Sequence, residues 1–211
     1  VFAFSNLESV NIPSAITSIS DSLFIGCNLS NFRIPSSITS IGKYAFAYNK
    51  ASFTSIEIPS SVQDIGEYAF KGTYYLKSVV LSSNITQIKE GVFYDCAITN
   101  ITIPASVKSI GKNAFCVADL EEIDIPSNVV CIGDSAFGFC ALTRVSISDS
   151  IAFIGNGAFC FNEFTSIDIP SSVTNISPSA FRSCDELVSI SVAAENPNYS
   201  SYGGVLYNKN A

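Results

Sequence analysis

The stretch that decides the fold is residues 34–46, IPSSITSIGKYAF, which returns as IPSSVQDIGEYAF at 58–70 and as IPASVKSIGKNAF at 103–115. Each copy ends on a phenylalanine, and this phenylalanine recurs along the whole chain at intervals of 22 to 24 residues. Its positions are Phe2, Phe24, Phe46, Phe70, Phe93, Phe115, Phe137, Phe159 and Phe181. A fixed period of this size is the sequence signature of a repeat architecture.

The other positions of the unit keep step with the phenylalanine. From the second unit onward an isoleucine stands five residues before it, and a β-branched residue stands eight residues before it. Apolar Ile123 and Ile125 alternate with Glu122 and Asp124, which predicts a half-buried strand, and a second extended piece follows at 128–132. A unit this short cannot bury its apolar face alone. We therefore expect a solenoid with a parallel β-sheet and about 22 residues per coil.

The rest of the unit predicts turns. Glycine follows the second extended piece in several units, where we expect a backbone with positive φ. These glycines are Gly42, Gly66, Gly111, Gly133 and Gly155. Residues 134–137 are too short for an α-helix, so we expect a 3₁₀ or single helical turn that places Phe137 in the interior.

Composition excludes several classes of function. The 211 residues contain no His, which excludes Ser-His-Asp and Cys-His catalysis and histidine metal ligands. The formal charge of −7 disfavours binding to nucleic acid. No stretch of about 18 apolar residues is present, so we expect no membrane insertion by this segment. The chain opens at Val1 in mid-pattern, which indicates a piece of a longer protein.

The three quoted segments resemble the BspA-like leucine-rich repeat family of microbial cell-surface proteins. The resemblance covers residues 1 to about 192 and is specific, because many columns of the unit agree. In the tail, NPNYSS at 196–201 followed by GGVLYNK at 203–209 is similar to the break that these arrays make between repeat blocks. The resemblance implies a right-handed, β-rich leucine-rich-repeat solenoid, an extracellular or cell-surface location, and adhesion or protein binding.

Other patterns carry less chemistry. Seven cysteines suggest a disulfide or metal framework, but their number is odd and no CxxC pair exists. We expect Cys to fill a small buried turn position, with at most one disulfide and no metal or cofactor. The glycine-rich residues 155–160 lack the third glycine of a phosphate-binding loop. Glu121, Glu122 and Asp124 are compatible with an acid–base pair or a calcium site, but a solvated sheet edge explains them more simply, and we assign no catalytic residue.

The outward residues of the first strand form the candidate binding surface. In a solenoid they tile one continuous face, and most of them are short hydroxyls or amides. Consecutive units break this pattern with Glu122, Asp124, Arg144 and Asp168. We predict that these four side chains lie on adjacent rungs and form the centre of a contact with a partner, because mixed charges orient a protein partner.

Three functions are compatible with such a chain. We favour a non-catalytic protein-binding or adhesion module of a microbial surface or secreted protein, whose partner is a host or extracellular-matrix protein. A structural spacer that holds another domain off the cell surface is the alternative. A carbohydrate-active enzyme on a parallel β-helix is the third, and the missing His and sparse charge weigh against it. We expect a monomer with a repeat domain at 1–192 and a C-terminal extension at 193–211 that caps the array or starts a further module.

Overall fold

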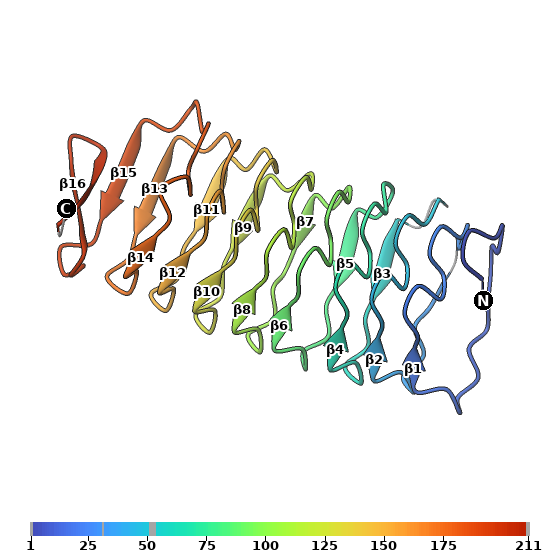
Figure 1. The fold of residues 1–211 in the computed structure, drawn as a ribbon. Helices are drawn as coiled ribbons and strands as arrows, with labels where there is room; N and C mark the ends of the chain where they lie inside the picture. Colours follow the sequence, from blue (N-terminus) through green and yellow to red (C-terminus); the bar gives the residue numbers. More distant parts are fainter. Residues whose placement is uncertain (1, 31, 51–53, 210–211) are drawn as a thin grey trace.

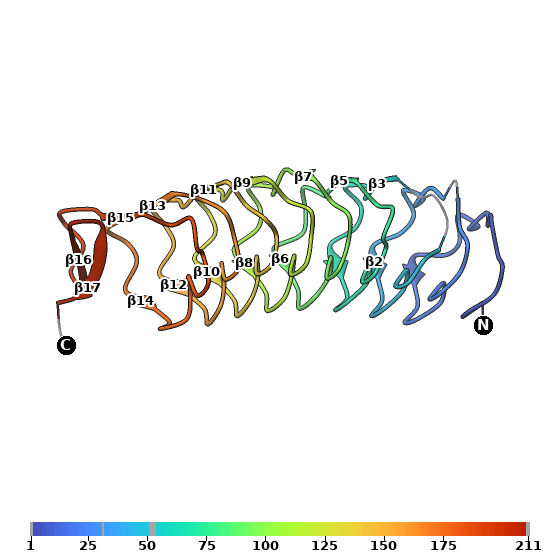
Figure 2. The ribbon, with the colours of Figure 1, turned by 90° about the horizontal axis from the view of Figure 1, so that it is seen from above.

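The computed structural model describes residues 2–30, 32–50 and 54–209, and it shows one long stack of coils with the two termini at opposite ends (Figure 1). The strands of neighbouring coils pair in parallel along the stack. No helix occurs among the described residues. Figure 2 shows the coils following one another in a nearly straight row. The predicted parallel-sheet solenoid with about 22 residues per coil is confirmed.

The first row of strands lies just before the turn that carries the recurring phenylalanine. Its members are β1 (Ser18–Ile19), β2 (Ser40–Ile41), β4 (Asp64–Ile65), β6 (Gln87–Ile88), β8 (Ser109–Ile110), β10 (Cys131–Ile132), β12 (Phe153–Ile154) and β14 (Asn175–Ile176). The second residue of each strand is the isoleucine of the repeat, and it pairs in register with its counterpart, as Ile132 does with Ile110 and Ile154. These isoleucines are buried in every coil except the last, where Ile176 is half-buried.

The second row of strands runs along another side of the coils. Its members are β3 (Ser55–Glu57), β5 (Ser78–Val80), β7 (Asn100–Ile101), β9 (Glu122–Asp124), β11 (Arg144–Ser146), β13 (Ser166–Ile169) and β15 (Ser189–Val192). The predicted alternation is present, because Ile123 is buried while Glu122 and Asp124 are exposed. Pairing divides this row into three sheets, β3-β5-β7, β9-β11 and β13-β15.

The recurring phenylalanines form one buried column through the stack. Neighbouring rings from Phe46 to Phe159 have centroids 5.3 to 5.6 Å apart and planes within 14° of each other. None of these rings is exposed to solvent. Stacked rings at this spacing attract one another, and this attraction adds to the stability that burial of the rings provides. The predicted phenylalanine stack is confirmed.

The turn around each stacked phenylalanine is not the predicted 3₁₀ segment. Two residues before Phe137, Ser135 has a φ of 51°, and two residues after it, Phe139 has a φ of 59°. Ser135, Phe137 and Phe139 donate their backbone N–H groups to carbonyls of the following coil, at 2.8 to 2.9 Å. A 3₁₀ helix would use these N–H groups within its own segment. Bonds between coils therefore replace every other hydrogen bond of a 3₁₀ helix, while the Ala136 and Gly138 N–H groups donate to the carbonyls three residues before them at 3.2 Å.

The prediction that the repeat glycines have positive φ is also wrong. The glycines Gly42, Gly66, Gly111, Gly133 and Gly155 are not among the residues with positive φ. In these five coils the neighbouring backbone approaches closely at this point, whereas the equivalent position holds Ser20, Lys89 and Ser177 in the other coils. A Cβ on Gly133 would lie 2.7 Å from the Lys112 backbone nitrogen and 2.8 Å from the Gly111 carbonyl carbon. Positive φ occurs instead at the turn positions that flank the stacked phenylalanine.

The cysteines occupy core positions, as predicted. All seven are free thiols, six are buried, and Cys131 is half-buried. Four of them also donate a hydrogen bond to the carbonyl of the phenylalanine in the preceding coil, and Cys140 does so to Phe115 at 3.0 Å. The others are Cys27, Cys96 and Cys184. In one coil Asn162 takes the same position and donates to Phe137 at 2.8 Å. In five coils this position, three residues after the stacked phenylalanine, therefore holds a small side chain that donates to the preceding coil.

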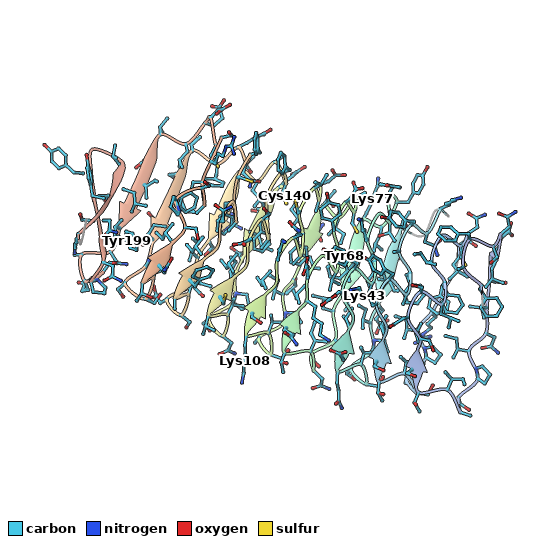
Figure 3. The ribbon with its side chains drawn as sticks, in the orientation of Figure 1. Lys43, Tyr68, Lys77, Lys108, Cys140 and Tyr199 are labelled. Carbon is cyan, nitrogen blue, oxygen red and sulfur yellow. The ribbon has the colours of Figure 1, made fainter. Side chains whose placement is uncertain are left out.

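An antiparallel hairpin, β16 (Tyr199–Tyr202) and β17 (Val205–Asn208), follows the last repeat coil at the C-terminal end. The Ile190 N–H of β15 donates to the Gly204 carbonyl at 2.9 Å. The buried Tyr199 hydroxyl, labelled in Figure 3, accepts a hydrogen bond from the Ile176 N–H at 2.9 Å. The hairpin thus satisfies backbone groups that a following coil would otherwise bond.

Candidate functional site

The four predicted contact residues project from the second strand row. In this row Arg144 of β11 pairs in register with Glu122 of β9. The Arg144 guanidinium donates through Nε to a Glu122 carboxylate oxygen at 2.8 Å. It also donates through its two terminal nitrogens to the Asp124 carboxylate, at 2.8 and 3.3 Å. One arginine therefore bridges two carboxylates of the preceding coil, a geometry that its planar fork favours.

The hydrogen bonds of this cluster shift the ionisation of its members. Donation from Arg144 lowers the pKa of Asp124, and the two carboxylates raise the pKa of Arg144. All three side chains are more than half exposed, so water and salt screen their attraction. The hydrogen bonds hold the three side chains in a defined geometry but add little to the free energy of unfolding. It carries two negative charges and one positive charge at neutral pH.

Asp168 is separate from this cluster. It lies on β13, one coil beyond Arg144, and pairs in register with Ser191 of β15. Within the described residues it forms no ion pair. Glu122, Asp124 and Arg144 are thus brought together, while Asp168 adds an isolated negative charge on the same strand row.

A shallow depression of about 340 Å³ borders the cluster. It lies between β7 and β9, where the second strand row is interrupted and no strand pairing joins these two described segments. Asn100 and Thr102 line one side, and Glu122, Asp124 and Arg144 line the other. The depression is polar at its rim and has Ile101 and Ile123 at its floor, so it presents both hydrogen-bonding and apolar contacts.

The other sequence patterns do not form sites. The described part of the chain brings together no three His, Cys, Asp or Glu side chains that could hold a metal ion. In the glycine-rich loop, the Asn156 N–H donates to the Asp134 carboxylate at 2.8 Å. The Gly155 N–H donates to the Ile132 carbonyl at 2.9 Å. These amides are already bonded, so they are not available to a phosphate.

A tyrosine cluster in the turns was missed by the sequence analysis. Tyr44 and Tyr68 stack at 5.1 Å, and the Lys71 ammonium lies 5.5 Å from the Tyr68 ring and 4.9 Å from the Tyr94 ring. Figure 3 labels Tyr68 together with Lys43, whose ammonium lies 5.6 Å from the Tyr44 ring. The signal was present, because six of the nine tyrosines lie between residues 44 and 94.

The comparison with protein families agrees with this geometry. The profile of the BspA type leucine rich repeat region, in six copies, matches residues 1–119 and 108–203. The chain belongs to the BspA-type leucine-rich repeat family. The resemblance seen in the repeated segments is confirmed. No curated protein matches this BspA-type chain.

Solved structures of bacterial leucine-rich repeat proteins share the fold. A leucine-rich repeat protein from Bacteroides ovatus is 23% identical with a TM-score of 0.51, over 92% of this chain and 69% of that one. The pneumococcal vaccine antigen PcpA is 22% identical with a TM-score of 0.51, over 92% of this chain and 40% of that one. The T. pallidum leucine-rich repeat protein TpLRR is 26% identical with a TM-score of 0.58, over 67% of this chain and 68% of that one.

The described residues contain no helix that is long and apolar enough to cross a membrane.

Proposed function

We propose that this BspA-type chain is a non-catalytic protein-binding or adhesion module of a microbial surface or secreted protein. One observation carries the proposal. The Arg144 fork with Glu122 and Asp124 stands at the rim of an open depression, on a strand row whose other outward side chains are mostly short and polar. This is the feature of the row best suited to orient a partner.

The cluster suits a protein surface better than a small ligand. Arg144 donates through all three guanidinium nitrogens to Glu122 and Asp124, and these bonds hold its side chain in place before a partner binds. The free carboxylate of Asp168 extends the charged area by one coil. Exposed charges of this kind raise association rates and fix orientation, while contributing little affinity of their own. We expect weak binding that falls as salt rises.

Membership of the family supports the kind of partner and the location that we propose. The name of PcpA describes it as a vaccine antigen, and exposure on a microbial surface is our proposal for this chain. A host or extracellular-matrix protein is the proposed partner, and the chain is proposed to act as a monomer. Glycoside hydrolysis needs two carboxylates on either side of a sugar, whereas Glu122 and Asp124 both bind Arg144, so we prefer a binding role to a carbohydrate-active one.

An array of purified extracellular-matrix proteins and glycans tests the proposal. The test variant carries Glu122→Ala, Asp124→Ala, Arg144→Ala and Asp168→Ala. A matched control carries Lys43→Ala, Glu67→Ala, Asp149→Asn and Glu195→Gln. Each variant loses three carboxylates and one cation, so the net charge rises by 3 − 1 = 2 in both.

The expected result is that the control keeps the binding of the parent at low salt and the test variant loses it. Both variants should keep their thermal unfolding temperature, because the exposed charges do not contribute to the phenylalanine stack. If the two folded variants bind alike, the contact lies elsewhere. If the parent binds nothing on the array at any salt concentration, the spacer becomes the better explanation.

A further inference from the structure

A second surface lies in the turns, two residues after each stacked phenylalanine. In three successive coils this position holds an exposed apolar side chain, Val117, Phe139 and Phe161, with φ between 56° and 60°. Positive φ is unfavourable for such residues, above all for β-branched valine. Four other coils place small or polar residues at the same position, Gly26, Gly72, Asp95 and Ser183. The two remaining coils hold Phe4, which is exposed, and Tyr48, which is half-buried, but neither belongs to a run of successive exposed apolar residues.

The three side chains form a regular stripe. The Phe139 and Phe161 rings stack with centroids 4.3 Å apart and planes 12° apart, yet they remain 49% and 43% exposed. Val117 is 39% exposed in the coil before them. The N–H of each residue donates to a carbonyl of the following coil, at 2.9 Å in all three cases. The stripe is therefore held by the inter-coil ladder and presents its side chains to solvent.

The fold itself does not account for these residues. Gly72 and Ser183 make the same turn without an apolar side chain, so the turn does not demand one. Phe139 and Phe161 are only partly buried, so much of their apolar surface remains in contact with water. The positive φ belongs to this turn in every coil, but exposed apolar side chains on successive coils are typical of a surface used for binding.

Carboxylates border the stripe in the Val117 coil, in the Phe161 coil and in the coil that follows Phe161. In the segments that lead from these turns to the second strand row, Asp119, Glu163, Asp185 and Glu186 are all exposed. None of the four forms an ion pair within residues 2–30, 32–50 and 54–209. An open depression of about 580 Å³ is lined by Phe161 together with Glu163, Asp185 and Glu186. Arg182, three residues before Asp185, is a cation in the next turn along the stack, and its carbonyl accepts the Phe161 N–H at 2.9 Å.

We infer that this stripe and its carboxylates bind a cationic segment of a partner protein, one that combines Arg or Lys with apolar side chains. Aromatic faces attract guanidinium and ammonium groups, and the neighbouring carboxylates accept their charge-assisted hydrogen bonds. Apolar side chains of the same segment cover Val117 and the ring edges. A second copy of the chain is disfavoured, because it would bring two rows of carboxylates together.

This surface is separate from the Arg144 cluster. The stripe lies in the turns, whereas Glu122 and Arg144 lie on the second strand row of the same coils. The inference therefore does not depend on the proposed function. A variant at either surface leaves the residues of the other in place.

Peptide binding tests the inference with defined probes. We would measure, by fluorescence anisotropy, the affinity of the intact chain for a short labelled peptide of alternating Arg and Leu. Peptides of alternating Arg and Ser and of alternating Glu and Leu separate the contributions of charge and apolar contact. The ring variant carries Phe139→Asn and Phe161→Asn, because Asn tolerates positive φ and should preserve the turn. Its control, Tyr74→Asn with Tyr75→Asn, removes two exposed aromatics elsewhere.

A carboxylate variant tests the charged border separately. It carries Glu163→Gln, Asp185→Asn and Glu186→Gln. A control with the same change in net charge carries Glu8→Gln, Asp149→Asn and Glu195→Gln, all on exposed residues of other coils. Comparing the two separates a local contact from general attraction between a cationic peptide and an acidic protein.

We expect the Arg–Leu peptide to bind most tightly. The ring variant should weaken it by about tenfold or more, and the carboxylate variant should weaken it and reduce its salt dependence. Both controls should bind like the parent. Equal affinity of the parent and the ring variant would overturn the inference, and so would equal affinity for the Arg–Leu and Arg–Ser peptides. Sedimentation showing a parent dimer that the ring variant abolishes would assign the stripe to a second copy instead.

Discussion

Replacing Gly133 by alanine isolates the reason for the repeat glycine. Its φ is not positive, so the backbone itself accepts an alanine. The added Cβ would lie 2.7 Å from the Lys112 nitrogen and 2.8 Å from the Gly111 carbonyl carbon, and both atoms belong to the backbone of the preceding coil. Neither can move aside as a flexible side chain would. The Gly133 N–H also donates to the Ile110 carbonyl at 2.8 Å, and separating the coils would stretch this bond.

Two opposing effects determine how much Gly133→Ala changes the free energy of unfolding. Forcing an extra methyl into a closely packed interior costs about 1–3 kcal/mol. Replacing glycine by alanine restricts the unfolded chain, which stabilises the folded state by roughly 0.4–1 kcal/mol. Because the contacts are with backbone atoms, we use the upper part of the packing cost. After subtracting the effect on the unfolded chain, we expect the free energy of unfolding to fall by about 1–2 kcal/mol. For a chain of this length that lowers the unfolding temperature by roughly 2–8 °C.

Urea unfolding followed by circular dichroism measures the change, with the slope of the transition checked for constancy. Gly203 is the matched control, because its φ is 57° and no atom lies within 4 Å of an added Cβ. Asparagine tolerates positive φ. Gly203→Asn should therefore be milder than Gly203→Ala, whereas Gly133→Asn should be at least as destabilising as Gly133→Ala. Parent-like stability of Gly133→Ala, or its improvement by Asn, would refute the close-approach explanation.

Three further predictions concern the core. Phe115→Ala should lower the free energy of unfolding by about 3–5 kcal/mol, because Phe115 is fully buried between two stacked rings, and a loss below about 1 kcal/mol in urea unfolding would contradict a cooperative stack. Cys140→Ala should cost roughly 1–3 kcal/mol by leaving the Phe115 carbonyl without its donor, and Cys140→Asn should cost less, because Asn162 makes the equivalent bond. Burial raises the pKa of Cys96 and Cys140 to about 12. Their ordinary value of 9.0 applies when the chain is unfolded, so their contribution to stability is complete below pH 9 and is lost as pH rises toward 12. Titration with a thiol reagent near neutral pH should label these thiols only after denaturation, and rapid native labelling would disprove their burial.

The periodic part of the fold could be predicted because it depends on one unit. Spacing alone placed Phe115 and Ile132 inward and Glu122 outward, since alternation and a fixed period determine which side chains share a face. It also placed Glu122 and Arg144 on adjacent rungs. The arginine fork could not be predicted, because its geometry depends on rotamers that only the packed rungs define.

The errors concern interactions between coils. The role of Gly133 depends on the distance to the preceding coil, and the turn at Ser135 depends on carbonyls of the following one. Neither partner is close in sequence, so local propensity pointed to positive φ and to a 3₁₀ turn. The tyrosine cluster was missed for the same reason, because Tyr44 and Tyr68 meet only when their coils stack.

The coils from Val117 to Glu186 depart from the repeat at two sets of positions that the core does not use. On the second strand row Arg144, Glu122 and Asp124 replace the short hydroxyls of most coils, and in the turns Val117, Phe139 and Phe161 expose apolar side chains on three successive coils. Neither change moves the phenylalanine column, because inward side chains and inter-coil backbone bonds set its position. A spacer needs only that column, and uniform polar residues would serve its surface. Departures on two sides of the same few coils, one of which leaves apolar side chains exposed, therefore favour a binding module over a spacer.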